Sequence, residues 1–355
     1  IVIVCMLFEM EGLMSTITVI GAGVMASSLS FPAVENGNEM RLTGTPLDRE
    51  IIDSVKANRY HPTLKRTLPE GVKAFQIEEL DAALDGCDAV ILGVSSFGVD
   101  WFIENALAKI PDKIPVIAVT KGVKVYDDGM IKTFPELFAS NVENGKSHEF
   151  CAIGGPCRCY ELADHDDTRV AFCGKNMEVL EFFKKLLERP YYHIDLTQDV
   201  AGLEIAVALK NAYALGVSLG IGLEEKQQKY MCNTQSALFG QSSYEIMKFV
   251  QYMGGNVENS IHGIGDLYVT VMGGRSKEIG KRLGAGMPYE QAMEELKGVT
   301  LESVVIARRA AKAVRILSEK NQIKKEDFPL ILHIDDVLQH GSMLDIPWKK
   351  FRVNE

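Results

Sequence analysis

The segment TITVIGAGVMASSLSFPAVENGNEMRLTGT constrains the fold more than any other part of this chain of 355 residues. Residues 16–23 are a β-branched run that ends in glycines, and residues 24–37 have the spacing of a helix that closes at Gly37. Residues 39–45 then predict a second strand. A strand, glycine turn, helix and strand within about thirty residues are the setting in which a protein binds the pyrophosphate of a dinucleotide.

The glycines of this turn stand where a dinucleotide site needs them. Gly21 permits the tight turn, Gly23 lets the backbone approach a pyrophosphate, and Ala26 takes the third position, where helix and strand pack closely. The anion would lie at the N-terminus of the helix, where free N–H groups and the helix dipole favour negative charge. The alternative is a turn that binds nothing, but the position of the motif near the start of the fold favours a cofactor site.

Two further segments predict buried parallel strands. Residues 87–96 (CDAVILGVSS) and 115–123 (PVIAVTKGV) are short apolar runs that end in loops. Ligands of such sheets bind beyond the carboxyl ends of the strands, and here those ends carry Ser95, Ser96 and Lys121. We therefore expect an α/β fold with a Rossmann-like doubly wound sheet, and these side chains near the cofactor.

The choice between NAD and NADP stays open in the sequence. NAD-selective sites usually place an acidic residue at the end of the second strand, where it holds the ribose hydroxyl. Here that stretch begins with threonines, and Asp48 and Arg49 follow only later. Asp48 suits NAD, whereas Arg49 suits the 2′-phosphate of NADP.

The pattern changes in the second half of the chain. Residues 150–161 and 168–173 predict two more strands, and the first runs into a glycine-proline loop. From Asp199 onward the spacing is helical to the end. The expected helix breaks are the motifs at 254–255 (GG), GIGD, GGRS and GAGMP.

These patterns divide the chain into three segments. They are an extension outside the fold (1–13), a dinucleotide-binding Rossmann domain (14–197) and a helical substrate and catalytic domain (198–355). The apolar start, IVIVCMLF, is too short to span a bilayer and lacks the basic flank of a secretory signal. We expect a cytoplasmic protein without stable membrane insertion. The net charge of −10, from 38 basic and 48 acidic residues, argues against general nucleic-acid binding.

The seven cysteines are odd in number and form no CxxC pair, which predicts reduced thiols in a reducing compartment. The cluster of Cys151, Cys157 and Cys159 could in principle hold a metal. No His or Cys at zinc-finger spacing completes it, so we expect no metal site.

Residues 203–216 (LEIAVALKNAYALG) are apolar almost all the way round the helix, apart from a Lys–Asn pair in the middle and Glu204 near the start. A helix of this kind is normally buried, and a lysine within it loses hydration and needs a partner or a chemical role. The alternative for Lys210 is an ammonium group that reaches the surface along its apolar stem. Glu204, near the start of the same helix, is interpreted as a residue that caps or anchors the helix.

Several ordered motifs together resemble one enzyme family. They are GAGVMA, NRYHPTLKRTLP, TKGV, GGPCRCYE, GLEIAVALKN, NTQSAL, GIGDLYVT, GGRSKEIG and DFPL, and the likeness covers nearly the whole chain from Thr16. The chain resembles the soluble, NAD(P)-dependent glycerol-3-phosphate dehydrogenases. The block GLEIAVALKN followed by GDL and GGR is far more specific than a glycine turn.

The resemblance implies a reaction and a set of roles. The enzyme would reduce dihydroxyacetone phosphate reversibly to sn-glycerol 3-phosphate with NAD or NADP, as a homodimer. Lys210 would be the general acid/base, with Asp266 and Lys121 as further catalytic residues. The implied cofactor contacts are Gly21, Gly23, Val24, Met25, Ser95, Lys121, Cys159, Arg275 and Glu302, and the implied substrate contacts are Lys121, Gly155, Asn211, Thr270, Gly274, Arg275 and Ser276.

The chemistry of this reaction suits these residue types. Hydride delivery to a ketone builds negative charge on its oxygen, which a positioned ammonium group stabilises before it donates its proton. Burial lowers the pKa of a lysine such as Lys210 toward the working range, and Asp266 would orient the lysine and offset its charge. A phosphate dianion favours a planar, permanently charged fork, which Arg275 offers.

Six positions depart from the family pattern. Arg158 and Cys159 replace an apolar residue and alanine. Cys157 stands where Ser or Asn is usual and Gln241 where arginine is common, while Ser276 replaces asparagine and Ser303 replaces glycine. Two alternatives therefore remain. One is a reductase of the same fold that acts on another phosphorylated ketone or a keto acid. The other is a dinucleotide-binding sensor that has lost turnover.

Overall fold

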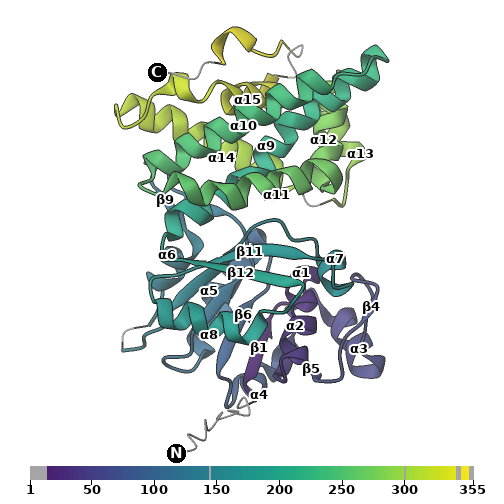
Figure 1. Ribbon diagram of the computed structural model, residues 1–355, viewed down its shortest axis with the longest axis vertical. Coiled ribbons are helices and arrows are strands. Elements are labelled where there is room, and N and C mark those ends of the chain that lie inside the picture. The colour runs from purple at the N-terminus through teal and green to yellow at the C-terminus, as the bar shows by residue number, and fades with distance from the viewer. Residues whose placement is uncertain (1–13, 144, 300, 341–344, 352–355) are drawn as a thin grey trace, which may run out of the picture.

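The computed structural model describes residues 14–143, 145–299, 301–340 and 345–351. The extension expected at residues 1–13 lies outside the described residues. The chain forms an α/β part and a helical part, which are stacked along the long axis of the molecule, with α11 on the side of the helical part that faces the sheet (Figure 1).

The α/β part is built on an eight-stranded sheet in the order β12-β11-β10-β7-β6-β1-β2-β5. Six neighbouring strands, from β10 to β5, run parallel, whereas β11 is antiparallel to β10 and β12 is parallel to β11. The strands of this sheet are β1 (Thr16–Ile20), β2 (Glu39–Thr43), β5 (Val72–Phe75), β6 (Ala89–Leu92), β7 (Val116–Ala118), β10 (Phe150–Gly154), β11 (Thr168–Cys173) and β12 (Tyr192–Thr197). The central strands β6 and β7 are buried along their whole length, which confirms the buried parallel strands expected at 87–96 and 115–123.

Short helices connect these strands. They are α1 (Val24–Ser28), α2 (Ser30–Glu35), α3 (Arg49–Asn58), α4 (Leu80–Leu84), α5 (Val99–Asn105), α6 (Phe134–Ala139), α7 (Cys159–Ala163) and α8 (Met177–Leu187). Two small hairpins are added, β3 (Tyr60–His61) with β4 (Arg66–Thr67) and β8 (Val123–Val125) with β9 (Ile131–Thr133). The expected doubly wound α/β fold is confirmed.

The helix predicted over 24–37 is interrupted at Leu29, which separates α1 from α2. Pro32 explains the interruption because it has no N–H to donate to the carbonyl group four residues earlier. Gly37 follows the end of α2 with a φ of +82°, as expected for the residue that closes a helix.

The glycine turn brings β1, α1 and β6 into close contact. Gly21 has a φ of +101°, and a Cβ there would lie 2.9 Å from the backbone of Gly93 and Val94. A Cβ on Gly93 would in turn lie 2.3 Å from the Cβ of Ala26. Glycine at positions 21 and 93 is therefore a packing requirement, as well as a requirement of the turn.

The helical part surrounds one long central helix, α9 (Val200–Gln227), against which α10, α11, α12, α14 and α15 pack. The other helices are α10 (Cys232–Tyr252), α11 (Ser260–Gly273), α12 (Arg275–Gly284), α13 (Tyr289–Glu295), α14 (Glu302–Glu319) and α15 (Pro329–His340). Short 3-10 turns lie at 77–79, 96–98, 107–109, 257–259, 325–327 and 348–350. By length and composition α9 could cross a membrane, but most of it is buried inside the structure, as the core helix of this part.

The helix breaks expected at 254–255, GGRS and GAGMP are confirmed, but the break expected at GIGD is wrong. Those four residues lie inside the continuous helix α11. A Cβ on Gly263 would lie 2.5 Å from the backbone of Ala206, and one on Gly265 would lie 3.3 Å from Pro156. The glycines therefore allow α11 to approach α9 and the loop after β10, and they do not end the helix.

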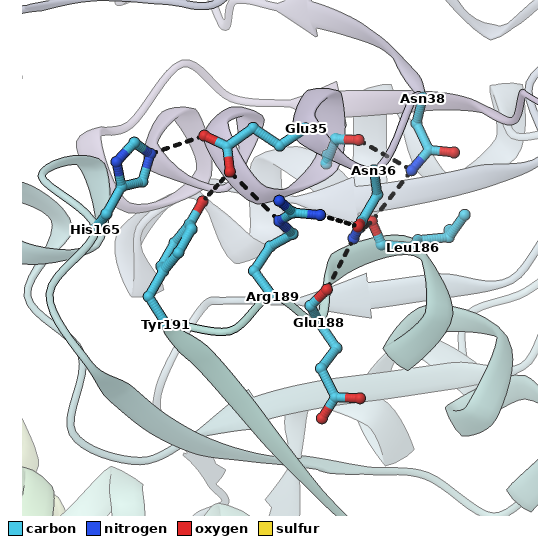
Figure 2. Close-up of polar contacts among 9 residues, drawn as sticks. Glu35, Asn36, Asn38, His165, Leu186, Glu188, Arg189 and Tyr191 are labelled. Carbon is cyan, nitrogen blue, oxygen red and sulfur yellow. Dashed lines mark hydrogen bonds and ion pairs between the residues drawn. The ribbon is translucent and has the colours of Figure 1, made fainter.

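A polar cluster joins the antiparallel end of the sheet to the first helical connection (Figure 2). The Glu35 carboxylate accepts hydrogen bonds from His165 Nε2 at 2.7 Å and from the Tyr191 hydroxyl at 2.8 Å, and Arg189 lies 3.4 Å from it. The Asn36 side chain donates to the backbone at the end of α8. These contacts fix the outer strands against the first β-α-β unit.

Candidate active site

Backbone and side-chain contacts hold the glycine turn from two sides. His61, from the NRYHP motif, is fully buried, and its Nε2 lies 3.0 Å from the carbonyl oxygen of Ala22. Because the Leu64 N–H donates to His61 Nδ1, the ring donates from Nε2 to the turn. On the other side, Asp48 Oδ2 accepts from the backbone N–H of Ala22 at 3.3 Å and of Thr45 at 2.8 Å.

This turn fits the pyrophosphate of a dinucleotide. Gly23 precedes α1, and no side chain caps the first turn of that helix, so its N–H groups remain available to an anion. A Cβ on Gly23 would lie 3.0 Å from the Gly93 carbonyl oxygen, so the space beside Gly23 has no room for a side chain. Val24 and Met25 are half-buried in the first turn of α1, and Cys159 begins α7, which packs against α1. Ser95 is exposed at the carboxyl end of β6.

Asp48 and Arg49, which leave the choice between NAD and NADP open in the sequence, have different partners. The Asp48 carboxylate faces inward to the glycine turn and also accepts from the Thr45 hydroxyl at 2.7 Å. Arg49 is exposed at the start of α3 and forms an ion pair with Glu78. The carboxylate that would suit a ribose hydroxyl is therefore engaged by the protein, while the guanidinium group lies at the surface.

The two predicted lysines meet at one carboxylate, Asp266 on α11. Lys210 Nζ lies 2.7 Å from Asp266 Oδ1 and 2.9 Å from the Thr270 hydroxyl oxygen. Lys121, on the loop between β7 and β8, pairs with the other oxygen of Asp266 and donates to the Gly155 carbonyl at 3.1 Å. We call Lys121, Asp266 and Lys210 the lysine centre, and its formal charge is +1 when both lysines are protonated.

Burial and pairing act in opposite directions in the lysine centre. The Lys210 side chain is 12% exposed and that of Asp266 is 3% exposed. Burial lowers the pKa of Lys210, although Asp266 counteracts part of the effect. Burial alone would raise the pKa of Asp266, but the two lysines outweigh it and hold this pKa below its usual range. Asp266 therefore stays ionised, and Lys210 gives up its proton more readily than an exposed lysine does.

Glu302, at the start of α14, connects the two parts of the molecule. Its carboxylate accepts from the Ser96 hydroxyl at 2.9 Å and from the Asn211 amide at 3.3 Å. Ser96 follows β6 and Asn211 is the neighbour of Lys210 on α9. In the sequence Ser96 was visible only as a strand-end residue, and nothing indicated its contact with Glu302, 206 positions later.

The start of α12 places three predicted substrate residues together. Gly274 precedes the helix, Arg275 is its exposed first residue, and Ser276 is buried. Within the described ranges, no hydrogen bond or ion pair engages the Arg275 guanidinium group. A second arginine, Arg158, lies against the same junction, with Nη2 3.5 Å from the position of a Cβ on Gly273. Its only signal in the sequence was that it departs from the family pattern.

The departing positions fall in different places. Cys157 lies in the loop after β10, near Lys121 and Asp266, and burial raises the pKa of its thiol to about 12. Gln241 lies in α10 and donates to the buried Glu245 at 2.8 Å, so it contributes to the helical core. Ser303 is buried in α14. Among the described residues, no three His, Cys, Asp or Glu side chains gather to hold a metal, and the six described cysteines are free thiols.

A doubly wound sheet with a glycine turn, joined to a helical part that supplies a buried lysine, defines a dinucleotide-dependent dehydrogenase. The family models agree with this class in both halves. Residues 16–180 match the N-terminal part of NAD-dependent glycerol-3-phosphate dehydrogenase, and residues 199–346 match its C-terminal part. The chain belongs to this family.

Known relatives extend over nearly the whole chain. It is 33% identical to an NADP(+)-dependent glycerol-3-phosphate dehydrogenase of Archaeoglobus fulgidus, over 93% of this chain and 96% of the relative. It is 29% identical to a glycerol-3-phosphate dehydrogenase [NAD(P)+] of Bacillus mycoides, with 93% of each chain covered. The crystal structure of glycerol-3-phosphate dehydrogenase from Coxiella burnetii has the same fold, with a TM-score of 0.78, 22% identity and coverage of 95% of this chain and 98% of that one. NAD or NADP is therefore the cofactor of the family.

Proposed function

We propose that this chain interconverts dihydroxyacetone phosphate and sn-glycerol 3-phosphate with NAD or NADP. The observation that carries the proposal is Lys210, which lies in the mostly apolar, buried part of α9 and whose Nζ is held by Asp266 and Thr270 of α11. In the reducing direction the carbonyl carbon gains a hydride and the carbonyl oxygen gains a proton. The bound reduced dinucleotide supplies the hydride, and the protein supplies the proton.

The lysine centre performs the proton chemistry in this proposal. Lys210 stabilises the negative charge that builds on the carbonyl oxygen and then donates its proton from Nζ. The lowered pKa of Lys210 favours that donation. Asp266 orients the two lysines and remains ionised, so it accepts no proton itself. Lys121 adds a second positive charge beside the reacting oxygen.

The start of α12 binds the substrate phosphate in the same proposal. Arg275 offers a guanidinium fork without a partner among the described residues, which suits a phosphate dianion. The proposed substrate contacts are Lys121, Gly155, Asn211, Thr270, Gly274, Arg275 and Ser276. The proposed cofactor contacts are Gly21, Gly23, Val24, Met25, Ser95, Lys121, Cys159, Arg275 and Glu302.

We also propose the organisation of the protein that the family likeness suggests. Residues 14–197 would bind the dinucleotide and residues 198–355 the substrate, with residues 1–13 as an extension. The enzyme would act in the cytoplasm as a homodimer. Size-exclusion chromatography with light scattering measures the oligomeric state directly.

The direct test is to mix the purified protein with dihydroxyacetone phosphate and follow the absorbance of NADH and, separately, of NADPH. Oxidation that depends on dihydroxyacetone phosphate supports the proposal. A folded protein that binds dinucleotide but oxidises neither cofactor contradicts it. Oxidation with another ketone or keto acid, but not with dihydroxyacetone phosphate, would identify a reductase for a different substrate.

A further inference from the structure

Glu204 is a fully buried carboxyl group for which the proposed reaction has no use. It lies on α9, six residues before Lys210, and its exposed fraction is 0%. Neither of its carboxyl oxygens has a hydrogen-bond partner among the described residues. The interpretation that Glu204 caps the helix is wrong, because Asp199 Oδ1 accepts from the Gly202 N–H at 2.9 Å and caps α9 instead.

The surroundings of Glu204 are mostly apolar. The start of α9 packs against β10 and β11, in a small cluster made of Ala152, Ala171, Cys173, Val200, Leu203 and Val207. Lys121 is the cation whose charge acts on Glu204 within the described part of the chain. Leu203, the neighbour of Glu204 on α9, packs against Gly154 at the end of β10, where a Cβ would lie 2.8 Å from the Leu203 side chain. The next residue, Gly155, accepts a hydrogen bond from Lys121 Nζ at 3.1 Å. The buried Glu204 therefore lies on the Lys121 side of the lysine centre, in the closed interior.

The other titratable groups on the packed elements do not offer Glu204 a counter-charge. Cys151 on β10 is buried, and burial raises the pKa of the Cys173 thiol on β11 well above its usual value, so these two thiols stay neutral. Asp199 is engaged at the start of α9. On α11, His262 faces Asp195 and Asp266 is shared by the two lysines.

A carboxylate without donors is disfavoured in such a place, so the neutral acid is the stable form. Burial raises the pKa of Glu204 to about 8, and Lys121 offsets part of that rise. At neutral pH the acid therefore leaves the lysine centre with its net positive charge. At a pH above about 8, an ionised Glu204 places a negative charge near Lys121. That charge offsets part of the positive charge of the lysine centre that a bound anion would meet.

We propose that Glu204 is a positioning residue that holds a proton behind Lys121 and so keeps the lysine centre positive for an anionic substrate at neutral pH. The proposal depends on the proposed function only in naming the anion as a phosphorylated ketone. In this proposal the protonation of Glu204 sets the affinity of the lysine centre for an anion. Glu204 acts through Lys121 and does not contact the substrate.

The test compares the wild type with E204Q, which keeps the shape but cannot ionise, and with E204D, which can. The dissociation constant for sulfate is measured by calorimetry from pH 6.5 to 9.5 at constant ionic strength, because sulfate stays a dianion throughout. We expect wild type and E204D to lose on the order of tenfold more affinity across this range than E204Q does, the size of effect that one nearby charge produces in a partly dry site. The loss that comes from Lys210 deprotonation is common to all three proteins and cancels in the comparison.

A second measurement needs no ligand. The native pKa of Glu204 is raised above the unfolded value of 4.5, so its contribution to stability is full below pH 4.5 and is lost as the pH rises to about 8. The denaturant midpoint of E204Q should therefore exceed that of the wild type by an amount that grows between pH 5 and 8 and then stays constant.

Three results would overturn the proposal: equal pH dependence of sulfate affinity in wild type and E204Q, a constant difference in unfolding midpoint, or an E204Q protein that does not fold. The last result would mean that the carboxyl group makes a contact that an amide cannot replace. Both measurements are independent of turnover, so a failure of the proposed reaction would show separately, as an absence of dihydroxyacetone-phosphate-dependent oxidation.

Discussion

The glycine turn and the lysine centre are suited to bind anions through different features. At the turn, glycines let the backbone pack closely against Gly93, no side chain caps the first turn of α1, and the neighbouring contacts from His61 and Asp48 go mainly to backbone atoms. At the lysine centre, two ammonium groups are held at a buried carboxylate, and Lys121 also donates to the backbone carbonyl of Gly155. The turn therefore depends on shape and the centre on charge, and changes in the two regions should affect different kinetic constants.

The largest effect should come from K210A. Removing the proposed proton donor should lower kcat by about 10²- to 10⁴-fold, the usual contribution of a positioned general acid. The dissociation constant for the dinucleotide, measured by fluorescence titration, should stay nearly the same because the turn is intact. The matched control is K226A, which removes an exposed lysine from the end of the same helix. If K210A kept more than a few per cent of kcat, the proton donor would have to be another group.

A smaller and more selective effect is expected from R275L at the start of α12. A lost charge-assisted hydrogen bond costs about 1.5–3 kcal/mol, so kcat/KM for dihydroxyacetone phosphate should fall by roughly 10- to 100-fold. The uncharged ketone dihydroxyacetone should be affected far less. K277L on the same helix removes an equal charge and serves as the control. Equal losses for both ketones would show that Arg275 does not bind the phosphate.

The turn itself can be tested with G93A, whose new Cβ would lie 2.3 Å from the Cβ of Ala26. Such overpacking costs about 1–3 kcal/mol, and we expect a lower free energy of unfolding together with a higher KM for the dinucleotide. The kcat at saturating cofactor should change little. G240A is the control, because a Cβ there meets nothing within 4 Å in the helix α10. A G93A protein with normal cofactor KM and reduced kcat would contradict the division between shape and charge.

The smallest effect should come from R49L and should appear only with NADPH. Asp48 is occupied at the turn, whereas Arg49 needs to leave only an exposed ion pair with Glu78, which contributes little to stability. We expect the KM for NADPH to rise by up to about tenfold, with the KM for NADH unchanged. K56L removes a comparable exposed ion pair, with Glu79, from the same helix α3 and should leave both constants unchanged.

The same division explains how far the sequence alone could lead. The turn and the buried strands around it leave short, local patterns, so they could be predicted, and even the interruption at Leu29 has a local cause in Pro32. The continuity of α11 could not be read in this way, because Gly263 is explained by the approach of Ala206 from another helix.

The contacts of the site depend still more on the tertiary fold. Lys121 and Asp266 are 145 positions apart, and no periodicity relates them. The family motifs contain both residues, but they do not indicate that Asp266 contacts two lysines. The position of Glu204 near a helix start predicts a cap, which is wrong. Its environment depends instead on β10, β11 and Lys121, which are distant in the sequence.

The segments that form the lysine centre come from both sides of the boundary between β12 and α9. Lys121 belongs to the first piece, while Lys210, Asp266 and Thr270 belong to the second. A chain cut between residues 197 and 200 would thus yield two fragments, neither of which holds the complete set. If the fragments fold and are fused to two proteins that associate, turnover would be restored only when those proteins associate. The boundary between β12 and α9 is therefore a suitable place to divide the chain for a split reporter.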